Sequence, residues 1–160
     1  MCLLKAKKMD VNHDIKVYKT LIVSKSSDGS EVYSSPFHRE MFWKIGERHL
    51  VGIPRAVTEI YEASDHKGTV INVYGNAFHS WANVSDARDL AVSVSENGSL
   101  DTAVGEFVIP GDSKYVYCGD SAVWPYSFTF APGYASSDLV FVGIVERFYE
   151  RGTLGYTGRD

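Results

Sequence analysis

Residues 15–25 read Ile-Lys-Val-Tyr-Lys-Thr-Leu-Ile-Val-Ser-Lys, and this segment carries the clearest structural signal of the chain. Apolar residues at positions 15, 17, 21 and 23 alternate with polar or amphipathic ones, which is the period of a strand with one buried face. Asp28-Gly29 follows, and such a pair readily adopts the positive φ angles of a tight turn. Because Val32 and Tyr33 come next, the sequence predicts an antiparallel hairpin.

Further strands are expected along most of the chain. Short apolar or alternating runs bounded by turn residues predict strands at 57–63, 69–74, 104–109, 114–118, 126–130 and 139–148. The polar stretch 64–68 should turn the chain between two of them. The apolar residues of 37–49 fit both helical and strand spacing, and we expect a strand or an ordered loop there.

One helix is expected, at about 85–96. Val84, Ala87, Leu90 and Val94 recur at helical spacing, and Asn97-Gly98 is typical of a helix end. The fold class is therefore α+β, with a predominantly antiparallel β-sheet or a partly open barrel and one short helix.

Composition limits the function classes. The 160 residues are 44% hydrophobic and 22% charged, which suits a single domain over 1–160, with flexible termini at 1–13 and 151–160. A net charge of -4 argues against a nucleic-acid partner. No export signal or membrane-spanning run is visible, so we expect a cytoplasmic protein without a membrane partner. Two distant cysteines and the absence of known phosphate-loop, dinucleotide or zinc motifs predict no cofactor and no metal.

The first candidate site is the segment Tyr74-Gly75-Asn76-Ala77-Phe78-His79-Ser80-Trp81, expected to be a loop between a strand and the helix. His79 could act as a general acid or base or as a donor to a ligand, and Trp81 could stack on a ring. The alternative is structural. Phe78 and Trp81 would then anchor the helix to the sheet, with His79 hydrogen-bonded in a cap.

The second candidate site is the segment Gly133-Tyr134-Ala135-Ser136-Ser137-Asp138. The side chains of Tyr134, Ser136 and Asp138 could bind a polar ligand together with the His79 segment. The alternative is a turn before the last strand, in which Ser and Asp side chains bond their own backbone.

Several of these motifs resemble a pattern in small uncharacterised proteins of gut bacteria (Bacteroides-type) and their phages. A strand ending in Gly, the stretch Phe78-His79-Ser80-Trp81 and a helix with Asp86-Ala87 are similar to that pattern. Ile109-Pro110-Gly111-Asp112-Ser113-Lys114-Tyr115 matches an Ile-Pro-x-x-Ser-x-Tyr stretch of those proteins, and Tyr134-Ala135-Ser136 matches a later one. The resemblance spans most of the chain and implies no known activity.

A weaker likeness is to ADP-ribosyltransferases, whose late strands carry a Ser-containing segment before an apolar strand. This chain departs from them because no clear catalytic Glu follows Ser136; Asp138 is nearest and Glu146 is too far along.

Three hypotheses of function follow, in this order of preference. The first is a non-enzymatic binding or accessory domain, phage- or mobile-element-derived, for a protein or small-molecule ligand. The second is a nucleotide- or NAD-handling enzyme of ADP-ribosyltransferase type, in which His79, Ser136 and Asp138 would line one deep cleft. The third is a structural homo-oligomer joined through an edge strand or the aromatic C-terminal third.

Overall fold

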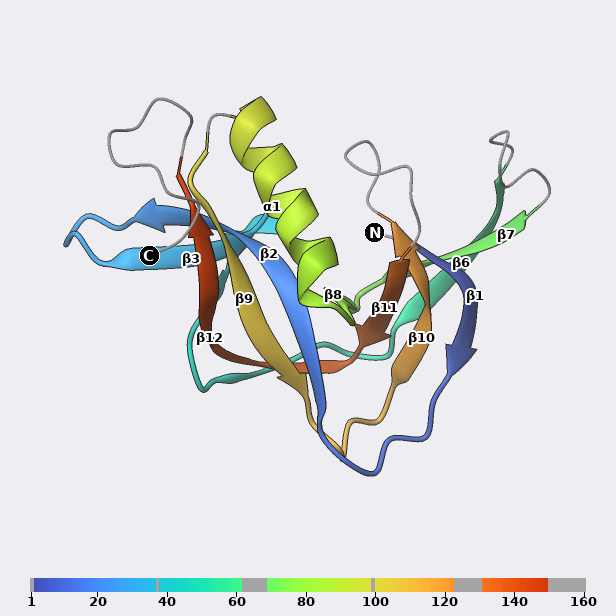
Figure 1. Ribbon diagram of the computed structural model, residues 1–160. Helices are drawn as coiled ribbons and strands as arrows, with labels where there is room; N and C mark the ends of the chain where they lie inside the picture. Colours follow the sequence, from blue (N-terminus) through green and yellow to red (C-terminus); the bar gives the residue numbers. More distant parts are fainter. Residues whose placement is uncertain (1, 37, 62–68, 99, 123–130, 150–160) are drawn as a thin grey trace.

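The computed structural model describes residues 2–36, 38–61, 69–98, 100–122 and 131–149 (Figure 1). Within these ranges the chain forms twelve strands and one helix. In chain order they are β1 (Cys2–Lys8), β2 (Ile15–Lys25), β3 (Glu31–Ser35), β4 (His38–Trp43), β5 (Arg48–Leu50), β6 (Arg55–Tyr61), β7 (Thr69–Gly75), β8 (Phe78–Trp81), α1 (Val84–Gly98), β9 (Thr102–Ile109), β10 (Val116–Ala122), β11 (Ala131–Ser136) and β12 (Asp138–Phe148).

The strands form one open, strongly bent sheet (Figure 1). Its order is β5-β12-β9-β2-β8-β11-β10-β1-β7-β6, and β3 pairs with both β2 and β4. Every pair of named strands is antiparallel. The prediction of a mostly antiparallel α+β fold with one helix is therefore confirmed, and of the two predicted forms the open sheet is the one observed.

The predicted hairpin is present, with β2 at the expected residues. Gly29 has a φ of 86°, the conformation that a turn glycine adopts without strain. The Asp28 carboxylate accepts hydrogen bonds from the hydroxyl of Ser26 and from the hydroxyl and backbone N–H of Ser30. These bonds, the one from Ser26 foremost, lower the pKa of Asp28 to about 2.

Helix α1 covers one face of the sheet, where it packs against β9, β2, β12 and β8 (Figure 1). Leu90 and Val94 are buried in this interface. Two threonines on neighbouring strands fix the helix, since Thr20 Oγ1 donates to the carbonyl of Ala87 at 2.7 Å and Thr102 Oγ1 donates to that of Ala91 at 2.9 Å. No helix in the described ranges is long and apolar enough to cross a bilayer.

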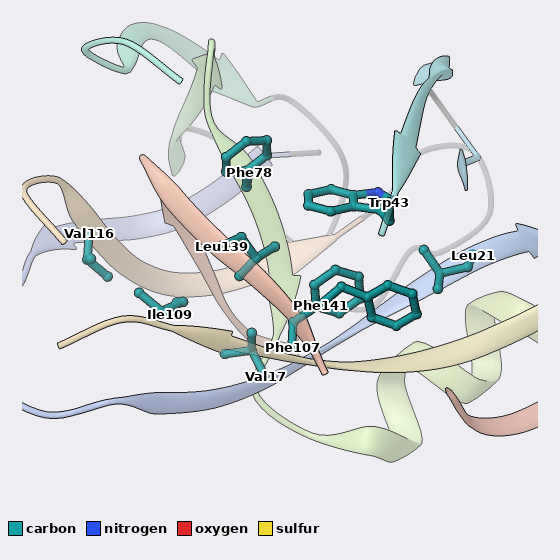
Figure 2. Close-up of a cluster of buried hydrophobic side chains, with 9 residues drawn as sticks. All are labelled: Val17, Leu21, Trp43, Phe78, Phe107, Ile109, Val116, Leu139 and Phe141. Atoms are coloured by element: carbon teal, nitrogen blue, oxygen red, sulfur yellow. The ribbon is translucent and has the colours of Figure 1, made fainter. Parts of the chain in front are cut away.

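The main hydrophobic core lies on the opposite face (Figure 2). Phe107 and Phe141 stack with ring centres 4.7 Å apart, and Trp43 meets Phe107 edge-on at 5.0 Å. Aromatic pairs in these geometries add stability beyond their buried area. The core consists of Val17, Leu21, Trp43, Phe78, Phe107, Ile109, Val116, Leu139 and Phe141.

The prediction of flexible termini is wrong at the N-terminal end of the chain. Residues 1–13 were expected to be flexible, yet Cys2–Lys8 form β1, between β7 and β10, and Leu3 is fully buried. A strand with partners on both edges gains main-chain hydrogen bonds that do not depend on an apolar pattern.

The strand expected at 114–118 lies at Val116–Ala122. The elements expected at 64–68, 126–130 and 151–160 lie outside the described residues.

Candidate functional site

The candidate site lies where β2 and β8 separate. The two strands share one register pair, Tyr18 with Trp81. Beyond it, residues 22–25 of β2 pair with β3 instead. A cavity of about 280 Å³ occupies this fork, and its lining includes Lys19 and Thr20 of β2, Phe78, His79 and Trp81 of β8, and Trp43 of β4. The fork therefore opens a small, mostly apolar cavity in an otherwise continuous sheet.

Lys19 is the charged group of this cavity. Strand alternation places it on the face of Val17 and Leu21, and only 8% of it is exposed. Its ammonium group donates a hydrogen bond to the main-chain carbonyl of His79 and lies 5.6 Å from the centre of the Trp43 ring. Among the described residues no carboxylate forms an ion pair with it. Burial lowers the pKa of Lys19 to about 8, because an apolar environment disfavours the charged form.

Two buried ring nitrogens, one on Trp43 and one on its neighbour His49, are also unusual. Trp43 of β4 and His49 of β5 have ring centres 4.6 Å apart. Trp43 Nε1 and His49 Nε2 are buried, and neither has a hydrogen-bond partner within the described part of the chain. Because nearly all buried polar atoms in folded proteins are hydrogen-bonded, each such atom requires an explanation.

His79 and Trp81 lie at this cavity, but in a strand and not in the predicted loop. Strand β8 is short, yet it pairs with β11 over four residues and with β2 at Trp81, so neighbouring strands hold it in place. Trp81 packs on Ala87 and Leu90 of α1, which agrees with the structural alternative for this residue. Phe78 instead joins the main core on the opposite face.

Tyr134 and Ser136 lie on the neighbouring strand β11, where a turn was predicted. They pair with Ser80 and Phe78, so they share the face of those residues and point away from the side chains of His79 and Trp81. Ser136 Oγ donates to the carbonyl of Asp138 at 2.9 Å. Burial, and then the nearby Cys118, raise the pKa of Tyr134.

Asp138 opens β12 and is a structural carboxylate. Arg48 donates to Asp138 Oδ2 through Nη2 at 2.6 Å and Nε at 3.0 Å, and the Ser137 hydroxyl donates to Oδ1. Arg48 also contacts the exposed Asp112 at 3.0 Å. His79, Ser136 and Asp138 thus do not line one cleft, as an ADP-ribosyltransferase-type site would require.

The sequence did not mark Lys19 or Trp43 as site residues, although both line the cavity. A signal for Lys19 was present in the sequence, because it occupies an inward position between Val17 and Leu21 of an alternating strand. A lysine on the buried face of a strand needs a partner or a cavity. No comparable signal marked Trp43, because the apolar residues of its segment fitted both helical and strand spacing.

No three His, Cys, Asp or Glu side chains in the described ranges are grouped so that they could hold a metal ion. Comparisons of the chain with protein-family models, with curated proteins and with solved structures find no match, so the resemblances drawn from the sequence stay predictions and the site is interpreted from its own geometry.

Proposed function

We propose that this chain is a small-molecule-binding domain and that its binding site is the cavity at the fork between β2 and β8. The observation that carries the proposal is Lys19. It is a buried cation that lines the cavity and has no acidic partner among the described residues.

The position of Lys19 is costly for the fold. Lowering the pKa of a lysine from 10.5 to about 8 corresponds to about 3 kcal/mol of disfavoured charge at neutral pH. Its hydrogen bond to the carbonyl of His79 satisfies one main-chain acceptor at the fork. A neutral donor would satisfy the same carbonyl without the cost of a buried charge. Strongly shifted groups in cavities are enriched at functional sites, and an accepting group of a ligand would offset this cost.

The lining suggests the character of the ligand. A cavity of about 280 Å³ is at the small end of the range of ligand sites. The rings of Trp43, Phe78 and Trp81 favour a compact apolar body. Lys19 favours one accepting group on that body. The described lining of the cavity includes Lys19 and His79, which can exchange a proton, but no carboxylate to pair with either of them, so we propose binding without catalysis.

A thermal-shift screen tests the proposal. The library contains small aromatic and aliphatic molecules, each present with and without an accepting group. A true ligand at about 100 times its dissociation constant should stabilise the wild-type protein by about 2.7 kcal/mol. Lys19→Met, which keeps the aliphatic stem, should lose this shift.

Lys16→Met is the matched control. It removes a lysine from the same strand, but one whose side chain is exposed and contacts Glu106 at the surface. It should respond to ligands like the wild type. Ligands that stabilise Lys19→Met as strongly as the wild type, or a library without a single hit, would contradict the proposal.

A further inference from the structure

We infer that the cavity takes a small aldehyde or ketone, which Lys19 Nζ holds by forming a reversible imine. This inference rests on the proposed function and deepens it, because it names the ligand class and the atom that binds the ligand. A carbonyl compound carries both the accepting oxygen that the cavity favours and a carbon atom that an amine can attack.

The bond forms by a balanced condensation. The lone pair of the neutral Lys19 amine attacks the carbonyl carbon, the C=O π electrons move to the oxygen, and the nitrogen passes one proton to that oxygen. A proton from solvent, equivalent to the one that the lysine had released, lets the hydroxyl leave as water while the nitrogen lone pair forms the C=N bond. The products are a protonated imine and one water molecule. Water reverses the reaction and returns the ligand unchanged, so the site binds without turnover.

The first argument is the environment of the amine. Lys19 lines the cavity, is 8% exposed and forms no ion pair within the described part of the chain. An acidic partner would keep the group protonated and without a lone pair. Burial instead lowers the pKa of Lys19 to about 8, so at pH 7 about one molecule in ten carries the nucleophilic amine, against about one in three thousand at the ordinary value of 10.5.

The second argument is the hydrogen bond that Lys19 donates to the main-chain carbonyl of His79. A neutral amine has two N–H bonds and one lone pair, so it can donate to this carbonyl and still present the lone pair to a ligand. A protonated imine keeps one N–H bond, which can donate to the same carbonyl. The buried acceptor therefore has a partner before and after the imine forms, and no unpaired group is created by binding.

The third argument is the ring of Trp43. Lys19 Nζ lies over this ring, 5.6 Å from its centre, and the face of an indole attracts a positive charge. The protonated imine carries its charge at the same nitrogen, so the ring stabilises the bound form as well. Edge-on contacts with Phe78 at 5.3 Å and Phe107 at 5.0 Å hold the ring in position (Figure 2).

The fourth argument is the lining. At the roughly 30 Å³ that a water molecule occupies in the liquid, a cavity of about 280 Å³ has room for about ten non-hydrogen atoms. Apolar side chains such as those of Met41, Val51 and Leu90 line it and limit the water that would hydrolyse the imine. A sugar would bury several hydroxyl groups against these side chains without partners. The ligand is therefore a compact aliphatic or aromatic carbonyl compound.

Reductive trapping on the wild-type protein tests this inference. Cyanoborohydride reduces a protonated imine to a stable secondary amine, and peptide mass mapping locates the modified lysine. The panel contains aldehydes and methyl ketones of up to about ten carbons, the size that the cavity admits. At pH 7 at least one of them should label Lys19 at least tenfold faster than Lys16, an exposed lysine of the same strand.

Three controls show whether the folded cavity causes this selectivity. In concentrated urea Lys19 and Lys16 should react at equal rates. An aldehyde attached to a group too large for the cavity should label Lys16 and not Lys19. Lys19→Arg keeps a cation at this position but has no amine that forms an imine, so it should lose the fast labelling while Lys16 reacts as before. Equal labelling of Lys19 and Lys16 in the folded protein by every small carbonyl compound would overturn the inference.

The alcohols that correspond to the panel separate this inference from the proposed function. They have the same carbon skeletons and an accepting oxygen, but they cannot form an imine. If alcohols and aldehydes stabilise the wild type and not Lys19→Met in thermal-shift assays, while Lys19 is not labelled, the imine is overturned and the proposed function stands. Absence of both labelling at Lys19 and any thermal shift would contradict both.

Discussion

Lys19 of β2 lies opposite Gly105 of β9 in the register of the two strands. Gly105 has no side chain, and the space beside it is filled by the side chains of Leu21, Phe107 and Phe141. A Cβ atom at position 105 would lie 2.8 Å from Leu21 Cδ1, 2.8 Å from Phe107 Cε2 and 3.0 Å from Phe141 Cε1. The stacked rings next to the fork therefore depend on a glycine directly across from the buried lysine.

Gly105→Ala should lower the free energy of unfolding by about 2 kcal/mol, because the core must shift to admit the methyl group. Urea denaturation measures this change. Gly143→Ala is the control, since nothing lies within 4 Å of a Cβ atom at that position of β12. It should leave stability unchanged or raise it slightly. Equal effects of the two substitutions would contradict the packing described at Gly105.

Lys19→Met should make stability less dependent on pH. The folded pKa of Lys19, about 8, is below the unfolded value of 10.5, so between these values the unfolded state binds more protons. Stability of the wild type should therefore rise with pH across this window, and the full penalty should be present below pH 8. At pH 7, removal of the charge should raise the free energy of unfolding of the variant by up to about 3 kcal/mol relative to the wild type. Loss of the hydrogen bond to the His79 carbonyl should lower it by about 1 kcal/mol.

Urea denaturation of both proteins at pH 6 to 10.5 checks this expectation. Other groups titrate in the same range, but they are common to both proteins and cancel in the difference. The stability advantage of the variant should be constant below pH 7, fall as the pH rises, and be gone by about pH 10.5, where the charge penalty has disappeared and the lost hydrogen bond remains. Curves that stay parallel would show that Lys19 carries no buried-charge penalty.

Much of the fold could be predicted because its longest strands carry strong local patterns. The alternation in 15–25 predicted the strand and one of its buried faces, and Asp28-Gly29 predicted the turn. The second face of β2 is also buried, because α1 packs on it. Helical spacing with Asn97-Gly98 at its end gave α1. In each of these elements local preference and tertiary packing agree, which is why local sequence was sufficient.

The elements that were missed are held by their neighbours. Strand β8 has four residues, and β11 consists largely of small residues, so neither shows a convincing period. Their pairing with each other and with β2 and β10 makes them strands. The fork is a property of this pairing, and so is the meeting of Lys19 with Trp43. Spacing along the chain could not reveal a contact that depends on where two strands separate.

Arg48→Met should destabilise the fold by about 2 kcal/mol, because it leaves the Asp138 carboxylate buried without its cation. The Asp138 side chain is 9% exposed, and Arg48 donates to it twice. Asp112→Asn is the matched control, because it weakens the other ion pair of Arg48 at a side chain that is 78% exposed. Exposed pairs contribute little, so this variant should stay within about 0.5 kcal/mol of the wild type.

Denaturant unfolding of the two variants separates a structural from a ligand-binding role for Asp138. If Asp138 anchors β5 to β12, Arg48→Met should lower the free energy of unfolding. Thermal shifts caused by ligands of the Lys19 cavity should then be as large in this variant as in the wild type. Unchanged stability together with lost ligand shifts would instead return Asp138 to the binding site. The double pair to Arg48 favours the first outcome, because a carboxylate already neutralised by a guanidinium has little affinity left for a polar ligand.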